Sequence, residues 1–219
     1  MIKLYGGRGE GASVTPSFVA AGAGVNAFND LDLEYPSVAA GMVFFAQVYS
    51  QLGESSGAPD GWVLVHEFTD GAVTQYVYRR TARSTGSDSG TVTFSMTLGD
   101  PNQGRIYAFE DVALADFIES IDDTYTTNGS ADGPTVAPNG PARLAVAFVS
   151  SNNGVTGMAA FTGESGGDWT EAVAEQTSGN GPGIQLQTAP LAAGGTISGG
   201  TAAVDGVRAI VIGFALAGT

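Results

Sequence analysis

Residues 43–48 read Val-Phe-Phe-Ala-Gln-Val, and residues 144–149 read Leu-Ala-Val-Ala-Phe-Val. Both runs are apolar on nearly every side chain, a pattern typical of a strand that is covered on both faces. A loop and then a tryptophan follow each run, and Trp62 and Trp169 are the two tryptophans of the chain. One strand-rich pattern therefore occurs twice, which indicates an internal duplication.

The spacing behind these runs repeats as well. Thr91 precedes Phe109 by 18 residues, and Thr196 precedes Phe214 by the same 18 residues. Side chains in Thr91–Leu98 alternate between apolar and polar, so Val, Phe, Met and Leu share one face of the expected strand. A duplicated pattern of this kind is typical of a scaffold built from two similar sets of strands.

These patterns predict an all-β fold, a jelly-roll-like β-sandwich built from two sequence-similar halves at about residues 35–121 and 134–219. Residues 1–16 are rich in glycine and are predicted to form an extended arm that a neighbouring molecule orders. Residues 17–219 would form a single sandwich, with each half supplying part of both sheets. Two tandem sandwiches of about 100 residues each fit the same pattern. We favour the single sandwich because the second half has fewer strands of its own.

Local patterns make three further predictions. Asp30–Tyr35 should be a strand with Leu31, Leu33 and Tyr35 inward. Val73–Arg80 should be a strand with its valines on one face and its tyrosines on the other, preceded by a hairpin turn at Asp70-Gly71. The spacing of apolar residues between Leu114 and Ile121 predicts a short helix.

The charge of the chain limits its partners. Lys and Arg total 8 and Asp and Glu total 22, for a formal net charge of −14. Such a polyanion repels nucleic acid and anionic lipid, so we expect neither nucleic acid nor a membrane as a partner. The chain has no cysteine, which excludes disulfides, thiolate catalysis and cysteine metal sites.

Neither targeting nor membrane insertion is indicated. The N-terminal residues lack a basic start followed by an apolar stretch, so we expect no signal peptide. The longest apolar run, Ile210–Ala217, is too short to span a bilayer. P-loop, dinucleotide-binding and zinc-binding motifs are absent from the sequence, and we expect no cofactor.

The best catalytic candidate is a serine-hydrolase triad of His66, Asp111 and Ser165. Residues 163–167 read Gly-Glu-Ser-Gly-Gly, which matches G-x-S-x-G and resembles the serine motif of trypsin-like proteases. His66 is the one histidine of the chain, and the order His, Asp, Ser is that of chymotrypsin-like enzymes.

Several observations argue against this triad. The residues before His66, Val-Leu-Val, do not resemble the segment that precedes the histidine in those enzymes. Asp111 and Ser165 are 54 residues apart, which is short for most of a second barrel. Glycine makes up 33 of 219 residues, so a chance match to G-x-S-x-G is unsurprising. We therefore expect a protein that is not an enzyme.

Carboxylates are numerous but select no catalytic pair. Asp30, Asp32 and Glu34 would share one face of a strand, and such a row can bind Ca²⁺ where loops add carbonyl oxygens. A solvent-facing side of the strand is the simpler interpretation. Seven acids between residues 100 and 123 indicate a solvated face or a contact surface for a basic partner: Asp100, Glu110, Asp111, Asp116, Glu119, Asp122 and Asp123.

Positive charges are rare and therefore candidates for contacts. On an acidic protein, Arg79, Arg80 and Arg83 could meet the acidic face of a neighbouring copy, although they could equally be ordinary charges at a strand end. The arm offers a second set of contact residues, which are Ile2, Lys3, Leu4, Tyr5 and Arg8. Trp62 and Trp169 could stack on sugars, but their places beside apolar runs favour the core.

Four segments of the first half contain short motifs beside the expected strands. Residues 35–45 contain P-x-V-x-x-G before an apolar strand, and residues 58–65 contain P-x-G-W-x-x-V. Residues 78–82 read Tyr-Arg-Arg-Thr-Ala, and residues 89–95 contain G-T-x-T-F-S. This succession resembles a recurring pattern in virion proteins of tailed bacteriophages, and the region around Trp169 in the second half fits the same style.

The resemblance implies a β-sandwich component of the virion: a head decoration (cement) protein, a fibre or a tail part. It implies synthesis in the host cytoplasm, assembly in many copies, and contacts with the major capsid or tail protein and with other copies. It brings no catalytic residues. We expect a surface decoration protein that packs as a homo-oligomer, anchored by residues 1–16. The alternatives are a carbohydrate-binding tail or fibre sandwich with host glycans as partners, and the serine hydrolase.

Overall fold

The computed structural model describes residues 14–51, 57–70, 73–96, 101–115, 117–127, 129–137, 143–152, 160–175, 182–191, 195–203 and 208–219. Within these ranges every regular element is a β-strand, and every strand pair is antiparallel. The all-β prediction is confirmed.

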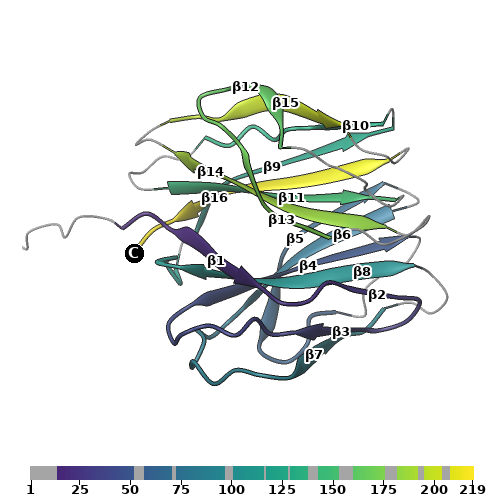
Figure 1. Ribbon diagram of the computed structural model, residues 1–219, viewed down its shortest axis with the longest axis vertical. Helices are drawn as coiled ribbons and strands as arrows, with labels where there is room; N and C mark the ends of the chain where they lie inside the picture. The colour runs from purple at the N-terminus through teal and green to yellow at the C-terminus, as the bar shows by residue number, and fades with distance from the viewer. Residues whose placement is uncertain are drawn as a thin grey trace, which may run out of the picture.

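The first half of the chain forms one large and one small sheet (Figure 1). Its strands are β1 (Ser17–Ala21), β2 (Val25–Ala27), β3 (Leu31–Glu34), β4 (Val43–Gln51), β5 (Trp62–Asp70), β6 (Val73–Arg80), β7 (Thr91–Phe94) and β8 (Asn102–Glu110). The large sheet has the order β1-β8-β4-β6-β5, with β2 also paired to β8, and β3 and β7 form the small sheet. The apolar run of β4 thus lies in the centre of its sheet, as its pattern predicts.

The second half repeats this arrangement. Its strands are β9 (Ile118–Thr126), β10 (Ser130–Asp132), β11 (Arg143–Ser151), β12 (Thr162–Ser165), β13 (Thr170–Glu175), β14 (Gly183–Leu191), β15 (Ser198–Ala203) and β16 (Ala209–Ala217). The large sheet reads β9-β16-β11-β14-β13, which is the order of the first half strand for strand, and β10, β15 and β12 form the small sheet. The prediction of two halves is confirmed in its coarse form, with β1–β8 in the first half and β9–β16 in the second.

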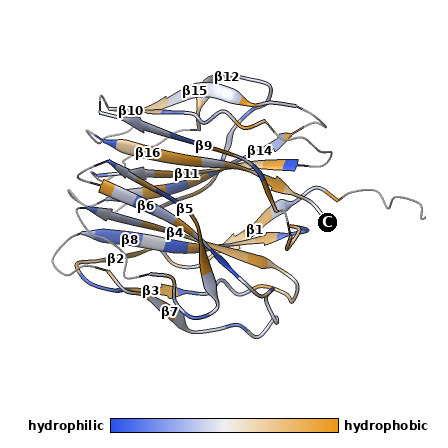
Figure 2. Cartoon of the chain, turned by 180° about the vertical axis from the view of Figure 1, so that it is seen from behind, coloured by the Kyte–Doolittle hydropathy of each residue, from blue (hydrophilic) through white to orange (hydrophobic). Residues whose placement is uncertain are grey.

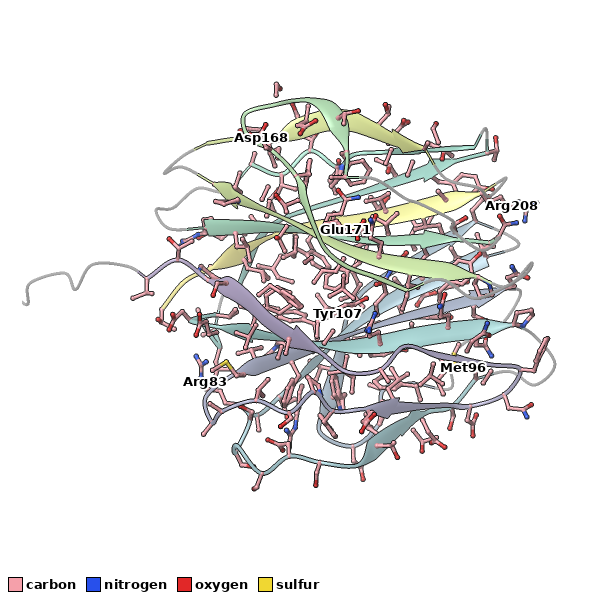
Figure 3. The ribbon with its side chains drawn as sticks, in the orientation of Figure 1. Arg83, Met96, Tyr107, Asp168, Glu171 and Arg208 are labelled. Atoms are coloured by element: carbon pink, nitrogen blue, oxygen red, sulfur yellow. The ribbon has the colours of Figure 1, made fainter. Side chains whose placement is uncertain are left out.

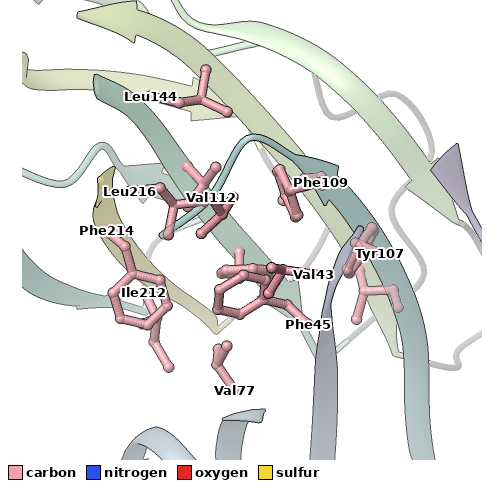
Figure 4. Packing of buried hydrophobic residues seen from close by; sticks show 14 of the residues in the cluster. Val43, Phe45, Val77, Tyr107, Phe109, Val112, Leu144, Ile212, Phe214 and Leu216 are labelled. Carbon is pink, nitrogen blue, oxygen red and sulfur yellow. The ribbon is translucent and has the colours of Figure 1, made fainter. Parts of the chain in front are cut away.

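Three apolar clusters hold the four sheets together in layers (Figures 1 and 2). The central cluster joins the facing sides of the two large sheets, with Phe45 and Phe109 from the first half near Phe214 from the second (Figure 4). Phe148 of the second half contacts both Phe45 and Phe214. A second cluster lies between the first large sheet and β3-β7, and a third lies between the second large sheet and its small sheet. The two halves therefore share one core and also have one core each.

The side-chain assignments of two strands are confirmed. In β6, Val73 and Val77 belong to the central cluster, whereas Tyr76 and Tyr78 belong to the outer cluster of the first half. In β3, the leucines are fully buried and the acidic residues between them are exposed. The alternation of side chains along these strands therefore predicted correctly which side chains face each core.

The predicted helix near residue 118 is wrong, because this segment enters the edge strand β9. A register shift in the pairing with β16 places Ile118 opposite Leu216 and Ile121 opposite Phe214. The extra residue of this bulge puts two isoleucines that are three positions apart on the same face of the strand. The bulge therefore imitates the spacing of a helix.

The assignment of strands to sheets also differs from the expectation. Among the described residues no sheet contains strands from both halves, whereas we expected each half to supply part of both sheets. The physical reason is that the strands of each half find their hydrogen-bond partners within that half. The halves meet mainly through the side chains of the central cluster, and also through backbone hydrogen bonds between residues 111–113 and the end of β16.

Candidate functional site

The three residues of the predicted triad lie in separate parts of the fold. His66 on β5 has its Nε2 atom 2.8 Å from Oδ2 of Asp123 on β9. Ser165 ends β12 in the outer small sheet of the second half, where its hydroxyl group is 3.0 Å from that of Ser198. The second large sheet lies between β12 and β5 (Figure 1). The structure therefore does not bring His66 and Ser165 together.

Asp111 belongs to a tight turn that ties the two halves. It has a φ of 56°, in the left-handed region, where an aspartate is tolerated better than most residues. Its carbonyl oxygen accepts a hydrogen bond of 2.9 Å from the amide of Thr219. The carbonyl of Thr219 in turn accepts a bond of 3.1 Å from the amide of Val14. Asp111 thus has a structural place beside the end of β16.

Two of the three calcium candidates, Asp30 and Asp32, accept hydrogen bonds from residues in or just after β7, the strand that pairs with β3. The Oδ1 atom of Asp30 accepts a 2.9 Å hydrogen bond from the amide of Met96, and Oδ1 of Asp32 accepts a 2.5 Å bond from the hydroxyl of Thr93. Glu34 is exposed at the end of β3. In the part of the chain that the structure describes, no group of three or more acidic or histidine side chains is arranged to hold a metal ion.

Acids of the stretch 100–123 that lie on β8 and β9 have partners within the protein. Glu110 accepts a 2.6 Å bond from the hydroxyl of Ser17, and Asp122 accepts a 2.6 Å bond from the amide of Thr135. Glu119 forms a two-pronged ion pair with Arg143, with 2.7 Å between Oε2 and Nε. Two more of the seven, at positions 100 and 116, lie outside the described residues.

Two of the three predicted contact arginines bind within their own half. The Nη1 atom of Arg80 donates to Oδ1 of Asp88 at 2.6 Å. Desolvation alone would raise the pKa of Asp88, but hydrogen bonds from the Thr85 amide and from Arg80 outweigh it, so this pKa is lowered. Arg83 donates to the carbonyl oxygens of Gly41 and Val112 at 2.7 and 2.6 Å.

Arg79 differs from these two. Its guanidinium lies over the ring of Phe117, with 4.2 Å from Cζ to the ring centroid. Its Nε and Nη1 atoms are shielded from solvent and have no hydrogen-bond partner among the described residues. Desolvation lowers the pKa of Arg79. The predicted contact residues of the arm, from Ile2 to Arg8, lie outside the described residues.

The aromatic residues considered as sugar platforms are buried. Trp62 is 5% exposed in the outer core of the first half, and Trp169 is 4% exposed in the outer core of the second. Trp62 stacks on Tyr35 at 6.2 Å between centroids, and Phe161 packs edge-on against Trp169 at 5.8 Å. These rings are core residues, and neither they nor Tyr76 and Tyr78 offer a face to a ligand.

A buried polar network between the two large sheets was missed from the sequence. The Nε2 atom of Gln47 donates to the carbonyl of Val149 at 2.9 Å, and Nε2 of Gln75 donates to the carbonyl of Phe148 at 2.9 Å. The hydroxyl of Tyr107, which points into the space between the sheets (Figure 3), donates to Oε1 of Gln47 at 2.9 Å. The signal was present, because Gln47 is the one polar residue inside an apolar run.

A tyrosine-rich group lies at one end of the same space. Burial is the main cause that raises the pKa of Tyr49 on β4. A hydrogen bond with Asp70 is the main cause that raises the pKa of Tyr125 on β9. The positive charge of Arg208 acts in the opposite direction on both groups, and Arg208 and Arg83 lie toward opposite ends of the sandwich (Figure 3). Neither phenol is activated, since a raised pKa keeps it protonated at neutral pH.

Comparison with known proteins finds no family model, no curated protein and no solved structure that matches this chain. None of the described residues belongs to a helix that could cross a membrane.

Proposed function

We propose that this chain is a non-enzymatic structural protein of a tailed-bacteriophage virion, a surface decoration (cement) protein that packs as a homo-oligomer. It would contact the major capsid or tail protein through residues 1–16, and would be made in the host cytoplasm before it joins the particle. The single observation that carries the proposal is the layered scaffold itself, in which two sheet pairs of the same strand order pack around three apolar cores.

The segments that resemble virion proteins support this proposal through their structural roles. Gly41, Gly61 and Gly90 of the three glycine-containing motifs have φ angles of 97°, 80° and 78°, a region that favours glycine. The Gly61 turn is closed by a 3.0 Å bond from the Trp62 amide to the Pro59 carbonyl. The motifs thus shape turns and deliver Trp62 to a core, as expected of a coat component and not of a reaction centre.

We infer further that the two halves behave as one compound domain of jelly-roll type over residues 17–219. Within the first half, β8 lies between β1 and β4, so the last strand of this half returns beside its first strand. Such returns are typical of jelly rolls. The shared central cluster supports one unit, because separating the halves would expose four phenylalanines that are fully buried, Phe45, Phe109, Phe148 and Phe214.

The test is co-sedimentation of the full chain with intact phage particles, with its copy number measured by quantitative mass spectrometry. A copy number comparable with that of the major capsid protein is expected of a decoration protein. A version that begins at residue 14 should keep the fold and lose particle binding, because the arm supplies the anchor. Complete absence of the full chain from particles would refute the proposed function.

A further inference from the structure

Three buried hydrogen bonds cross between the two large sheets, and all three have their donor in the first half. The Nε2 atom of Gln75 on β6 donates to the carbonyl oxygen of Phe148 at 2.9 Å. The Nε2 atom of Gln47 on β4 donates to the carbonyl oxygen of Val149 at 2.9 Å and to the hydroxyl of Ser150 at 3.1 Å. All the acceptors lie on β11, the central strand of the second large sheet. The polar contact between the sheets therefore runs in one direction, from amides of the first half to oxygen atoms of the second.

Gln47 differs in chemistry from its counterpart, the residue at the matching place in the second half. Gln47 and Phe148 are each the fifth residue of the apolar run in their own half. The ring of Phe148 packs against rings of the first half, with centroid distances of 6.4 Å to Phe45 and 5.7 Å to Tyr107. One half therefore presents an amide where the other half presents an aromatic ring.

Gln75 and its counterpart show the same difference. Tyr49 on β4 and Ser150 on β11 hold matching places, since each lies six residues after the start of its apolar run. Gln75 is the cross-strand partner of Tyr49, and Ile184 on β14 is the cross-strand partner of Ser150. Ile184 is thus the counterpart of Gln75, and it belongs to the central cluster. The two large sheets share their strand order but face each other with different surfaces.

This difference discriminates between the halves as packing partners. If two first halves packed together, a glutamine would stand in the place of Phe148, and its amide would lie among aromatic rings that an apolar side chain now fills. If two second halves packed together, two Phe148 rings would compete for the same space, and the glutamine donors would be missing. Only a first half on a second half both satisfies the amides and fills the core.

We propose that Gln47 and Gln75 form a pairing lock, which makes the first half pack on the second half and rejects the like half of another copy of this chain. Like halves of two copies share a strand order with the native partner, so they are the closest competitors for this interface. Multidomain and repeat proteins misassemble through such competitors, and buried polar residues are a known means of specifying a partner. The inference goes beyond the proposed function and does not depend on it, because it concerns how one molecule folds.

The test is refolding of the full chain from urea at protein concentrations from about 1 to about 100 μM, followed by size-exclusion chromatography with light scattering. At each concentration the refolded wild type should have the elution position and mass of protein that was never unfolded. The double variant Gln47→Leu/Gln75→Leu should form additional dimers or larger species, in a fraction about tenfold or more above that of the wild type. Gln75→Leu alone is a milder variant that loses one hydrogen bond, and it should form the same species at the highest concentrations.

Two control variants separate pairing from stability. Gln103, the other cross-strand partner of Tyr49, is equally buried, but neither atom of its amide has a hydrogen-bond partner among the described residues. Gln103→Leu should therefore refold like the wild type. Gly166→Ala lowers stability through a backbone clash in the turn after β12, away from the central cluster, and should also refold without additional species.

Three results would overturn the inference. They are leucine variants at Gln47 and Gln75 that refold like the wild type, a Gly166→Ala protein that forms the same additional species, and a wild type that itself misassembles on refolding. Absence of the protein from phage particles would instead refute the proposed function, so the two failures are distinguishable.

Discussion

Replacing Gln47 by leucine should destabilise the whole molecule, because this side chain joins the two large sheets. Gln47→Leu removes the bonds to the carbonyl of Val149 at 2.9 Å and to the hydroxyl of Ser150 at 3.1 Å. It also removes the acceptor of the Tyr107 hydroxyl, and both Gln47 and Tyr107 are fully buried. The substitution therefore removes three hydrogen bonds from the space between the sheets.

The magnitude follows from these contacts. Two lost neutral hydrogen bonds cost about 1 kcal/mol each, and a buried hydroxyl without an acceptor costs about 1–3 kcal/mol. The leucine side chain returns about 1–2 kcal/mol through its additional apolar surface. The expected net loss in the free energy of unfolding is about 1–4 kcal/mol. Urea unfolding, followed by circular dichroism and compared at equal slope, measures this loss.

A double-mutant cycle with Tyr107→Phe tests the reasoning more closely. If the orphaned hydroxyl causes part of the loss, then removing it in the double variant restores about 1–2 kcal/mol relative to the sum of the single variants. Additive single variants, or a Gln47→Leu protein that unfolds at the wild-type urea midpoint, would refute the argument that this network couples the halves.

Three other predictions rest on different parts of the fold. Because the pKa of Asp88 is lowered in the folded state, its stabilisation is present above its ordinary value of 3.8 and is lost as the pH falls through the folded-state pKa; Asp88→Asn should therefore cost about 1 kcal/mol in urea unfolding at pH 7, and less and less below about pH 4. Gly166→Ala should lower the melting temperature far more than the control Gly163→Ala, since both have positive φ but a Cβ atom at Gly166 would lie 1.7 Å from a backbone oxygen while Gly163 faces open space. Fluorescence of the single-tryptophan variants Trp62→Phe and Trp169→Phe should report coincident unfolding of both halves, because they share the central core; two separate transitions would contradict one cooperative unit.

Much of the fold could be predicted from the sequence because each strand carries its own pattern. The apolar run from Val43 to Val48 marks a strand buried on both faces, and it is the central strand of its sheet. The alternation in β6 predicts both cores that the strand serves. The segment at Ile118 was misread because an irregular pairing with β16 shifts the alternation by one residue. A bulge depends on the partner strand, so local periodicity does not reveal it.

The candidate contact surface could be predicted only in part. The scarcity of positive charge identified Arg79, Arg80 and Arg83 together as contact residues. Their contacts differ because Arg80 pairs with Asp88 whereas Arg79 lies over the ring of Phe117. Phe117 comes close to Arg79 only when the second half packs against the first. Which arginine lacks an acceptor is therefore a property of the tertiary structure.

The edges of the two large sheets decide how copies of this protein can associate. The strands β1, β5, β9 and β13 lie at edges, and the pairing of each with its inner neighbour contains a register shift; the three-residue strand β2, which continues the β1 edge along β8, pairs regularly. The pairs among inner strands are regular. Bulges at edges interrupt the straight row of backbone groups that another strand would need for pairing, and so protect a sheet from edge-to-edge aggregation. The irregular edges thus hinder pairing between the sheets of different molecules. Contacts between copies of this protein would then have to come from side chains and not from pairing of strand edges.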